Sequence, residues 1–177
     1  MSYTKTCAAF LTITLAFLSC EKENESLYWG EVSAVKNDIK WAGKIKAVKS
    51  KFADSKVEIT IKTFDEQNVS LETLGFYKVP SKVGRYELSR TFNQPPDDSL
   101  VGALYANGYD DEVYDFYEIA EDDSTSYLEI TDYNEKTAEI KGNFNLILWR
   151  DTTLPGAWNA PDSIVFSNGV FHTRIRD

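Results

Sequence analysis

An alternation of apolar and polar residues with a period of two recurs along most of the chain and most limits its fold. Residues 57–63, VEITIKT, have apolar side chains at the first, third and fifth positions, and residues 127–131, YLEIT, repeat the pattern. Successive side chains of a β-strand point to opposite faces, so this spacing places the apolar residues on one buried face. Helical periodicity is nearly absent. The sequence therefore predicts an all-β protein.

The longest alternation is residues 138–149, AEIKGNFNLILW, which predicts a strand that crosses the whole domain and bends at Gly142. Other segments with strand character are 29–35, 39–48, 70–78, 84–91, 100–106, 113–119 and 163–175. We expect a tight turn at Asn37-Asp38, a bulge near Asn168-Gly169 and a short helical turn within residues 71–76. About nine or ten strands with short connections predict an antiparallel β-sandwich or barrel.

The first 19 residues have the proportions of an export signal. They carry one charge, Lys5, ahead of an apolar and hydroxyl run that is too short for a membrane-spanning helix. An ordinary signal-peptidase site before Cys20 would have the large Phe17 at its third-last position, which is unfavourable. Residues 17–20, FLSC, resemble instead a bacterial lipobox, which implies that Cys20 is lipidated after removal of residues 1–19. The alternative, a structural Cys20, has only Cys7 of the signal as a partner.

Residues 20–26 combine Cys20 with the polar stretch EKENES, which predicts a solvated tether. The stretch resembles the acidic signal that directs some Bacteroidetes lipoproteins to the cell surface. We therefore expect an outer-membrane protein, held to the membrane by its lipid anchor and exposed at the surface. A plain spacer facing the periplasm is the alternative. Residues 27–177 form a single β-rich domain in this scheme, because no repeat or linker divides them.

Charge disfavours nucleic acid as a partner. Loss of Lys5 leaves 18 of the 19 basic residues against 28 acidic ones, a formal charge of −10. A strongly negative chain without a basic patch repels phosphate backbones.

Catalytic and metal chemistry have few candidate residues. His172 is the one histidine, and we expect it on the polar face of the last strand rather than in a catalytic triad. Acidic groups in the loops suit a calcium ion, but no calcium-binding loop motif occurs and a solvated acidic surface is the alternative. Two carboxylates roughly 5 to 9.5 Å apart across a cleft would suit glycoside hydrolysis. We expect no cofactor and no metal, and we assign no catalytic residue.

Aromatic residues, 14% of the chain, supply the candidate binding residues. The first four are Tyr105, Tyr109, Tyr114 and Tyr117, which alternate with carboxylates; such a surface can stack on sugar rings and hydrogen-bond their hydroxyls. Cross-strand aromatic pairing within a sheet is the alternative. The fifth is Trp158, in a long segment without strand character, where it could contact a glycan or a partner protein or could cover an end of the core.

Three short motifs resemble uncharacterised Bacteroidetes lipoprotein domains. Residues 127–131, 140–144 and 164–171 match the order LxIT, IxGxF and VxxxNGxF, while Trp41-Ala42 and residues 84–88 resemble the WxA and GxYxL elements of those domains. The resemblance implies a β-rich fold behind a lipobox and supplies no catalytic residues.

These features favour a noncatalytic, lipid-anchored envelope protein that binds a glycan, a small ligand or a partner protein. The alternatives are a carboxylate-dependent, glycosidase-like hydrolase and a structural or assembly subunit whose edge strand pairs with another chain. Carboxylates facing each other in a cleft would favour the hydrolase, and exposed aromatic side chains would favour glycan binding.

Overall fold

The computed structural model describes residues 27–50, 55–90, 100–120, 123–153 and 159–177, and within these ranges the protein is all-β. The eleven strands of the described residues are β1 (Gly30–Lys36), β2 (Ile39–Ala42), β3 (Lys44–Lys49), β4 (Lys56–Phe64), β5 (Ser70–Pro80), β6 (Gly84–Ser89), β7 (Val101–Tyr109), β8 (Glu112–Ile119), β9 (Tyr127–Asn134), β10 (Glu139–Arg150) and β11 (Ser163–Arg176). The predicted helical turn within residues 71–76 is wrong, because that segment lies in β5. One strand more than expected arises because residues 39–48 divide at Gly43 into β2 and β3.

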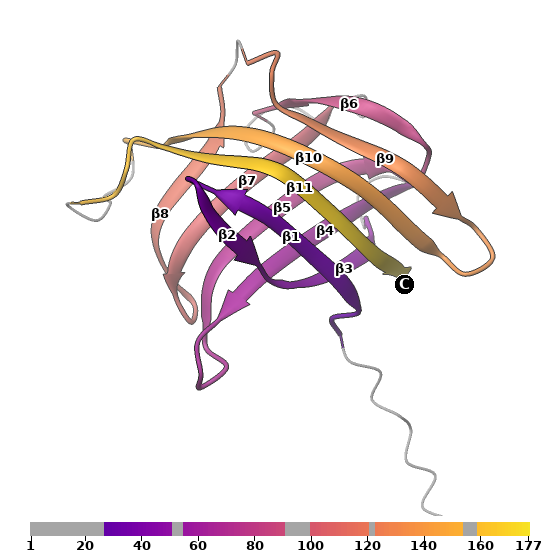
Figure 1. Cartoon of the computed structure of the whole chain (residues 1–177), viewed down its shortest axis with the longest axis horizontal. Helices are drawn as coiled ribbons and strands as arrows, with labels where there is room; N and C mark the ends of the chain where they lie inside the picture. Colours follow the sequence, from indigo (N-terminus) through magenta and orange to yellow (C-terminus); the bar gives the residue numbers. More distant parts are fainter. Residues whose placement is uncertain (1–26, 51–54, 91–99, 121–122, 154–158) are drawn as a thin grey trace, which may run out of the picture.

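Eight of these strands close into a barrel (Figure 1), in the order β11, β3, β4, β5, β7, β6, β9, β10 and back to β11. The pairs β11–β3 and β6–β7 are parallel, so the expectation of a wholly antiparallel sheet is corrected to a mixed one. Both parallel pairs are short and join segments that a hairpin does not connect. β8 pairs with β7 and with the end of β10, and the β1–β2 hairpin continues the sheet outward from β11.

Two irregularities predicted from the sequence are confirmed. Asn37 and Asp38 both have positive φ, 47° and 66°, as the two central residues of a type I′ hairpin turn require. The register of β11 against β1 and β10 shifts around Asn168, whose φ is 53°. The next residue must be small, because a Cβ at Gly169 would lie 2.5 Å from the Phe144 ring. The bulge thus lets β11 pass directly over a core aromatic residue.

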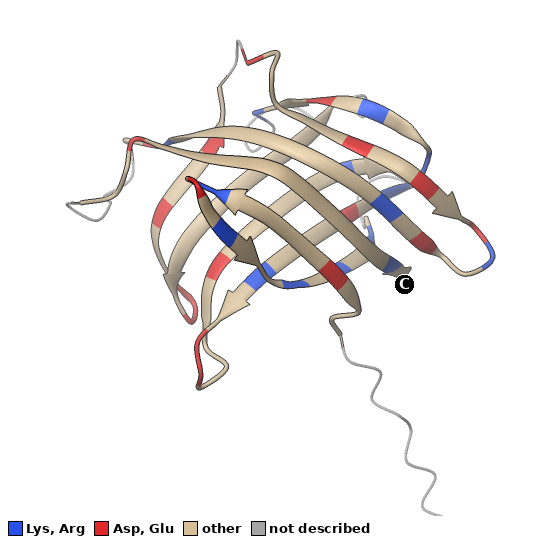
Figure 2. Ribbon diagram, in the orientation of Figure 1, with Lys and Arg blue, Asp and Glu red and all other residues tan. Residues whose placement is uncertain are grey.

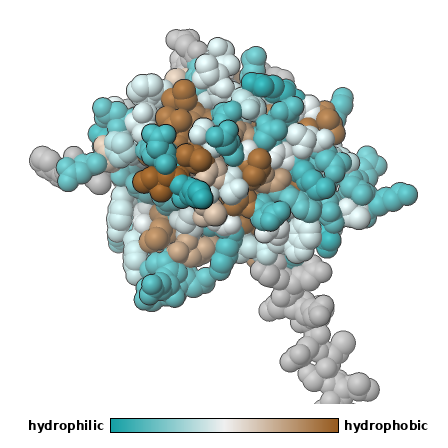
Figure 3. All heavy atoms as spheres, viewed as in Figure 1, coloured by the Kyte–Doolittle hydropathy of each residue, from teal (hydrophilic) through white to brown (hydrophobic). Residues whose placement is uncertain are grey.

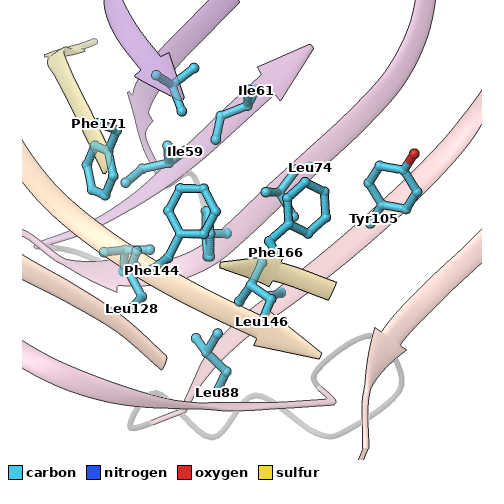
Figure 4. Close-up of a cluster of buried hydrophobic side chains, with 14 of the residues drawn as sticks. Ile59, Ile61, Leu74, Leu88, Tyr105, Leu128, Phe144, Leu146, Phe166 and Phe171 are labelled. Atoms are coloured by element: carbon cyan, nitrogen blue, oxygen red, sulfur yellow. The ribbon is translucent and has the colours of Figure 1, made fainter. Parts of the chain in front are cut away.

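Aromatic side chains fill the barrel interior (Figure 4). The rings of Phe76 and Phe144 lie 5.4 Å apart, and Phe166 lies 5.6 Å from Tyr105. All four residues are almost fully buried. Such ring separations are those of favourable aromatic pairs. The centre of the barrel is therefore a packed core, and the hydroxyl of Tyr105 points away from it toward one end of the barrel (Figure 4).

The described residues contain no helix that is long and apolar enough to cross a membrane. The predicted signal, residues 1–19, the lipidation candidate Cys20 and the tether through Ser26 lie outside the described residues. The lipid anchor stays a prediction from the sequence.

Candidate functional site

Several connections meet at one end of the barrel, which we call the loop end. They are the β1–β2 turn, the β4–β5 loop, the β7–β8 hairpin and the bases of the β10–β11 connection (Figure 1). Acidic residues mark the β4–β5 loop and the β7–β8 hairpin (Figure 2), and the Asp110 amide joins the two by donating to the Ser70 carbonyl at 2.9 Å. The loop end therefore presents an acidic rim.

A row of polar side chains lies just inside the loop end. Thr63, Glu72, Asn107 and Asp115 are successive register partners across β4, β5, β7 and β8. Register partners project to the same face, and this row follows the buried row that contains Tyr105 and Tyr117. With about 4.8 Å between neighbouring strands, the backbones at Glu72 and Asp115 lie about 10 Å apart. The interior thus changes from aromatic to polar near this end.

Glu72 is the centre of the densest hydrogen-bond network in this layer. Its carboxylate accepts hydrogen bonds from Trp41 Nε1 at 2.6 Å, from the Tyr105 hydroxyl at 2.9 Å and from Thr63 Oγ1 at 3.3 Å. It also forms an ion pair with Lys36. Each carboxylate oxygen therefore has two donors, which is the number it can accept. The network ties the β1–β2 hairpin to β4, β5 and β7.

Burial and hydrogen bonding shift the pKa values of this network. Burial acts to raise the pKa of Glu72, but the hydrogen bonds from Lys36, Trp41 and Tyr105 and the Lys36 charge outweigh burial, so the pKa lies below its usual value. Burial first, and then the Glu72 charge, raise the pKa of Tyr105 far above its ordinary value. At neutral pH Glu72 is thus an acceptor and Tyr105 a donor, which is the chemistry of a structural clamp.

A buried carboxylate, Asp115, lies at the base of the β10–β11 connection. Its Oδ1 lies 4.0 Å from the Arg150 guanidinium, and its backbone amide donates to Asn107 Oδ1 at 3.1 Å. Nearby, the Tyr117 hydroxyl donates to the Pro161 carbonyl at 3.1 Å. Burial, and then the Asp115 charge, raise the pKa of Tyr117. These contacts hold residues 159–162 against β8.

The four candidate tyrosines divide into two pairs. Tyr105 and Tyr117 are buried, with ring centroids 5.6 Å apart, so their rings form the cross-strand pair that was the structural alternative. Tyr109 and Tyr114 are 49% and 47% exposed at the β7–β8 hairpin. Trp158, the fifth candidate, lies outside the described residues. The structure therefore leaves Tyr109 and Tyr114 as the accessible members of the set.

Sequence analysis missed a third exposed aromatic residue, Trp149, which is 51% exposed. Trp149 lies on the outer face of β10 and pairs with Glu118 of β8, whose carboxylate forms an ion pair with Arg90. A signal was present, because Trp149 occupies one of the odd, otherwise mostly polar positions of residues 138–149. We call Tyr109, Tyr114 and Trp149 the exposed aromatic set. Figure 3 shows further hydrophobic residues on the face formed by β1, β2, β10 and β11.

His172 lies on the outer face of β11, where the alternation placed it. Its Nε2 lies 3.2 Å from Glu139 Oε2, and Arg174 contacts the other oxygen of that carboxylate at 3.3 Å. The Trp29 ring meets the imidazole edge-on at 5.3 Å. Hydrogen bonds from His172 and then Arg174 lower the pKa of Glu139. Among the described residues, no group of three or more histidine, cysteine or acidic side chains is arranged to hold a metal ion.

Comparisons with known proteins identify no relative of this chain. No family model matches it, and neither does any curated protein or solved structure. The resemblance of its short motifs to Bacteroidetes lipoprotein domains stays a prediction from the sequence.

Proposed function

We propose that this chain is a noncatalytic, lipid-anchored protein of the bacterial outer membrane that binds a glycan through the exposed aromatic set. The observation that carries this proposal is the exposure of about half of each of Tyr109, Tyr114 and Trp149. Large aromatic rings are costly to leave in water and stack well on the apolar faces of sugars. The neighbouring carboxylates of the β7–β8 hairpin accept hydrogen bonds from sugar hydroxyls.

A small apolar ligand is less favoured because side chains already occupy the barrel interior. The aromatic and aliphatic core residues, Phe144 and Phe166 among them, are almost fully buried in one another. Binding inside would require the barrel to lose this packing, whose density contributes much of its stability. The packed core therefore favours a ligand site on the outer surface.

The hydrolase alternative requires one carboxylate that can donate a proton and another that can attack or activate water. Glu72 has all its acceptor positions engaged and a lowered pKa, so it is unsuited to donate a proton. Asp115 is 3% exposed, which leaves no access for a glycosidic bond. Half-buried Glu72 and buried Asp115 thus suit a structural role better than acid and base chemistry.

Assembly through an edge strand is disfavoured by the shape of the edge. β2, which ends the strand order of the described sheet, has four residues, and Lys40 within it is exposed. Short edges with an exposed lysine are a common protection against pairing with another chain. The surface location in our proposal rests on the lipobox, since two or more acyl chains on Cys20 would hold the protein durably in a bilayer.

Glycan binding is tested with the full chain purified in a mild detergent, first on a glycan array and then by titration calorimetry. We expect Tyr114→Ala and Trp149→Ala each to weaken binding about three- to tenfold, because an aromatic contact contributes about 0.5–1.5 kcal/mol beyond its buried area. Val83→Ala is the control, since Val83 is exposed in the β5–β6 turn at the opposite end of the barrel. If the variant that combines Tyr114→Ala with Trp149→Ala folds and binds the glycan with unchanged affinity, the proposal is refuted.

A further inference from the structure

Two adjoining depressions cross the outer face of the sheet. The first has a volume of about 590 Å³ and is lined by Glu31, Val32, Ser33, Lys141, Val170, Phe171 and His172. The second has a volume of about 380 Å³ and is lined by Ser33, Ala34, Val35, Lys40, Trp41, Ala42 and Asn168. Ser33 lines both, so the two depressions adjoin, and together we call them the transverse valley.

Small side chains on neighbouring strands produce the floor of the valley. Val170, Ser33 and Ala42 are successive register partners on β11, β1 and β2. The side chains of the adjacent row are longer, and two of them are charged. In this row His172 of β11 is the register partner of Lys141 on β10 and of Glu31 on β1. A low row next to a high row makes a channel that runs across the strands rather than along them. Figure 2 shows the acidic and basic positions interspersed over these strands.

The length of the valley suits an extended chain. From β10 to β2 it spans three intervals between paired strands, about 14 Å, which accommodates a chain of about three sugar rings. The valley is shallow and open to solvent, so a ligand could extend beyond it at either end. Its dimensions therefore match a segment of a polymer better than a single small molecule.

The polar groups along the wall fit an uncharged ligand with many hydroxyl groups. Lys141 donates, Glu31 accepts and Ser33 does both, so donors and acceptors alternate along the channel. The charges along the valley are balanced locally. Lys141 Nζ lies 3.4 Å from Asp132 Oδ2, and His172 Nε2 lies beside Glu139 Oε2. A hydroxyl can donate and accept at once and meets both kinds of wall group. Val170, 53% exposed, supplies an apolar surface for the face of a sugar ring.

An extended peptide fits the valley less well. Peptides that bind sheets add a strand to an unpaired edge and use backbone hydrogen bonds. The valley crosses β11 and β1, each of which is already paired on both sides where the valley passes. Only side chains are therefore available to a ligand there, and these favour hydroxyl groups.

From these observations we infer that the transverse valley binds a linear, uncharged oligosaccharide of about three units. This inference rests on the proposed glycan-binding function and names its ligand class and a second contact surface. The valley and Trp149 lie on the same outer face of β10 and β11, so one longer chain could contact both.

The decisive variant is Val170→Arg, which fills the floor of the valley with a long side chain. Val83→Arg is its control, because Val83 is also an exposed valine but lies in the β5–β6 turn and lines neither depression. Both variants of the full chain in mild detergent are titrated with β-linked oligomers of glucose, xylose and mannose, two to six units long. We expect Val170→Arg to weaken binding at least about tenfold and Val83→Arg to leave it unchanged.

The single histidine gives an independent measurement, since His172 lines the valley and the chain holds no other imidazole. We expect its NMR ring signals to shift on addition of the oligomer that binds, and affinity to rise with length up to about three units and then level off. Binding that needs Trp149 and Tyr114 but leaves His172 unshifted and tolerates Val170→Arg would overturn this inference alone. Binding that is lost in Val170→Arg but unaffected by the aromatic substitutions would overturn the proposed function instead. Failure of every oligomer to bind would overturn the valley inference, and failure on the glycan array as well would overturn both.

Discussion

Replacing Glu72 with alanine removes the acceptor on which the buried polar layer depends. The wild-type carboxylate accepts from Trp41, Tyr105 and Thr63 and balances the charge of Lys36. In the variant, these donors lose their partner while they stay in a largely dehydrated environment. We therefore expect a loss of stability well above that of an ordinary surface substitution.

The size of the expected stability loss follows from the partial burial of the Lys36–Glu72 ion pair. Removing one partner of a buried pair costs about 3–5 kcal/mol, because the other charge stays unpaired. The side chains of Lys36 and Glu72 are 22% and 19% exposed, which allows water to reach Lys36 in part and places the expected loss near the lower value. Adding Lys36→Met to Glu72→Ala should recover part of it, since the unpaired cation is then removed as well.

The stability lost in Glu72→Ala must also depend on pH, and the direction of that dependence follows from the pKa shift of Glu72. Because folding lowers the pKa of Glu72, its ionised form contributes stability that is present above the unfolded pKa, about 4.3. That contribution is lost as the pH falls through the lower pKa of the folded state. The stability difference between wild type and Glu72→Ala should thus be larger at pH 7 than at pH 3.

Urea unfolding monitored by tryptophan fluorescence measures both quantities. At a typical urea dependence of about 1–3 kcal/mol per molar, the variant's midpoint at pH 7 should fall by about 1–3 M. Glu66→Ala, an exposed carboxylate in the neighbouring β4–β5 loop, is the control and should shift the midpoint little. Equal urea midpoints for wild type and Glu72→Ala, or a difference that does not change with pH, would refute the stabilising role of the Glu72 hydrogen-bond network.

Three further substitutions test the anchor and the backbone. Cys20→Ala should abolish incorporation of labelled fatty acid and move the protein from the membrane fraction to the soluble fraction; retention of label would contradict lipidation. Gly142→Ala should cost about 1–3 kcal/mol in urea unfolding, because a Cβ there would overlap the Glu129 carbonyl and the Phe171 ring, and a neutral result would show that β9 can move aside. Asp38→Gly should raise stability by about 0.5–1 kcal/mol in the same assay, since relief of the left-handed backbone, about 1–2 kcal/mol, exceeds the entropy cost of glycine, about 0.5–1 kcal/mol, whereas a loss would mean that the Asp38 side chain supports the turn.

Part of the candidate site could be predicted and part could not. Exposure of Tyr109 and Tyr114 agrees with their position beside the acidic hairpin, whereas Tyr105 has the same kind of neighbours in the sequence and is buried. The difference arises because Tyr105 faces the barrel interior and Tyr114 does not, which depends on strand register. The sequence did not indicate a role for Glu72, because its hydrogen-bond donors come from four other strands and are all distant from it in the chain.

By itself, the sequence determined the secondary structure, the positions of the main irregularities and the residues available for chemistry. Period-two alternation and the Asn37-Asp38 turn are local properties, since each depends on the backbone geometry of a few adjacent residues. Only the tertiary structure decided that the sheet closes, that two of its pairings are parallel, and that Val170, Ser33 and Ala42 form one channel. Those features depend on contacts between strands far apart in the chain, and an alternating pattern states which face is buried but not which strand lies beside it.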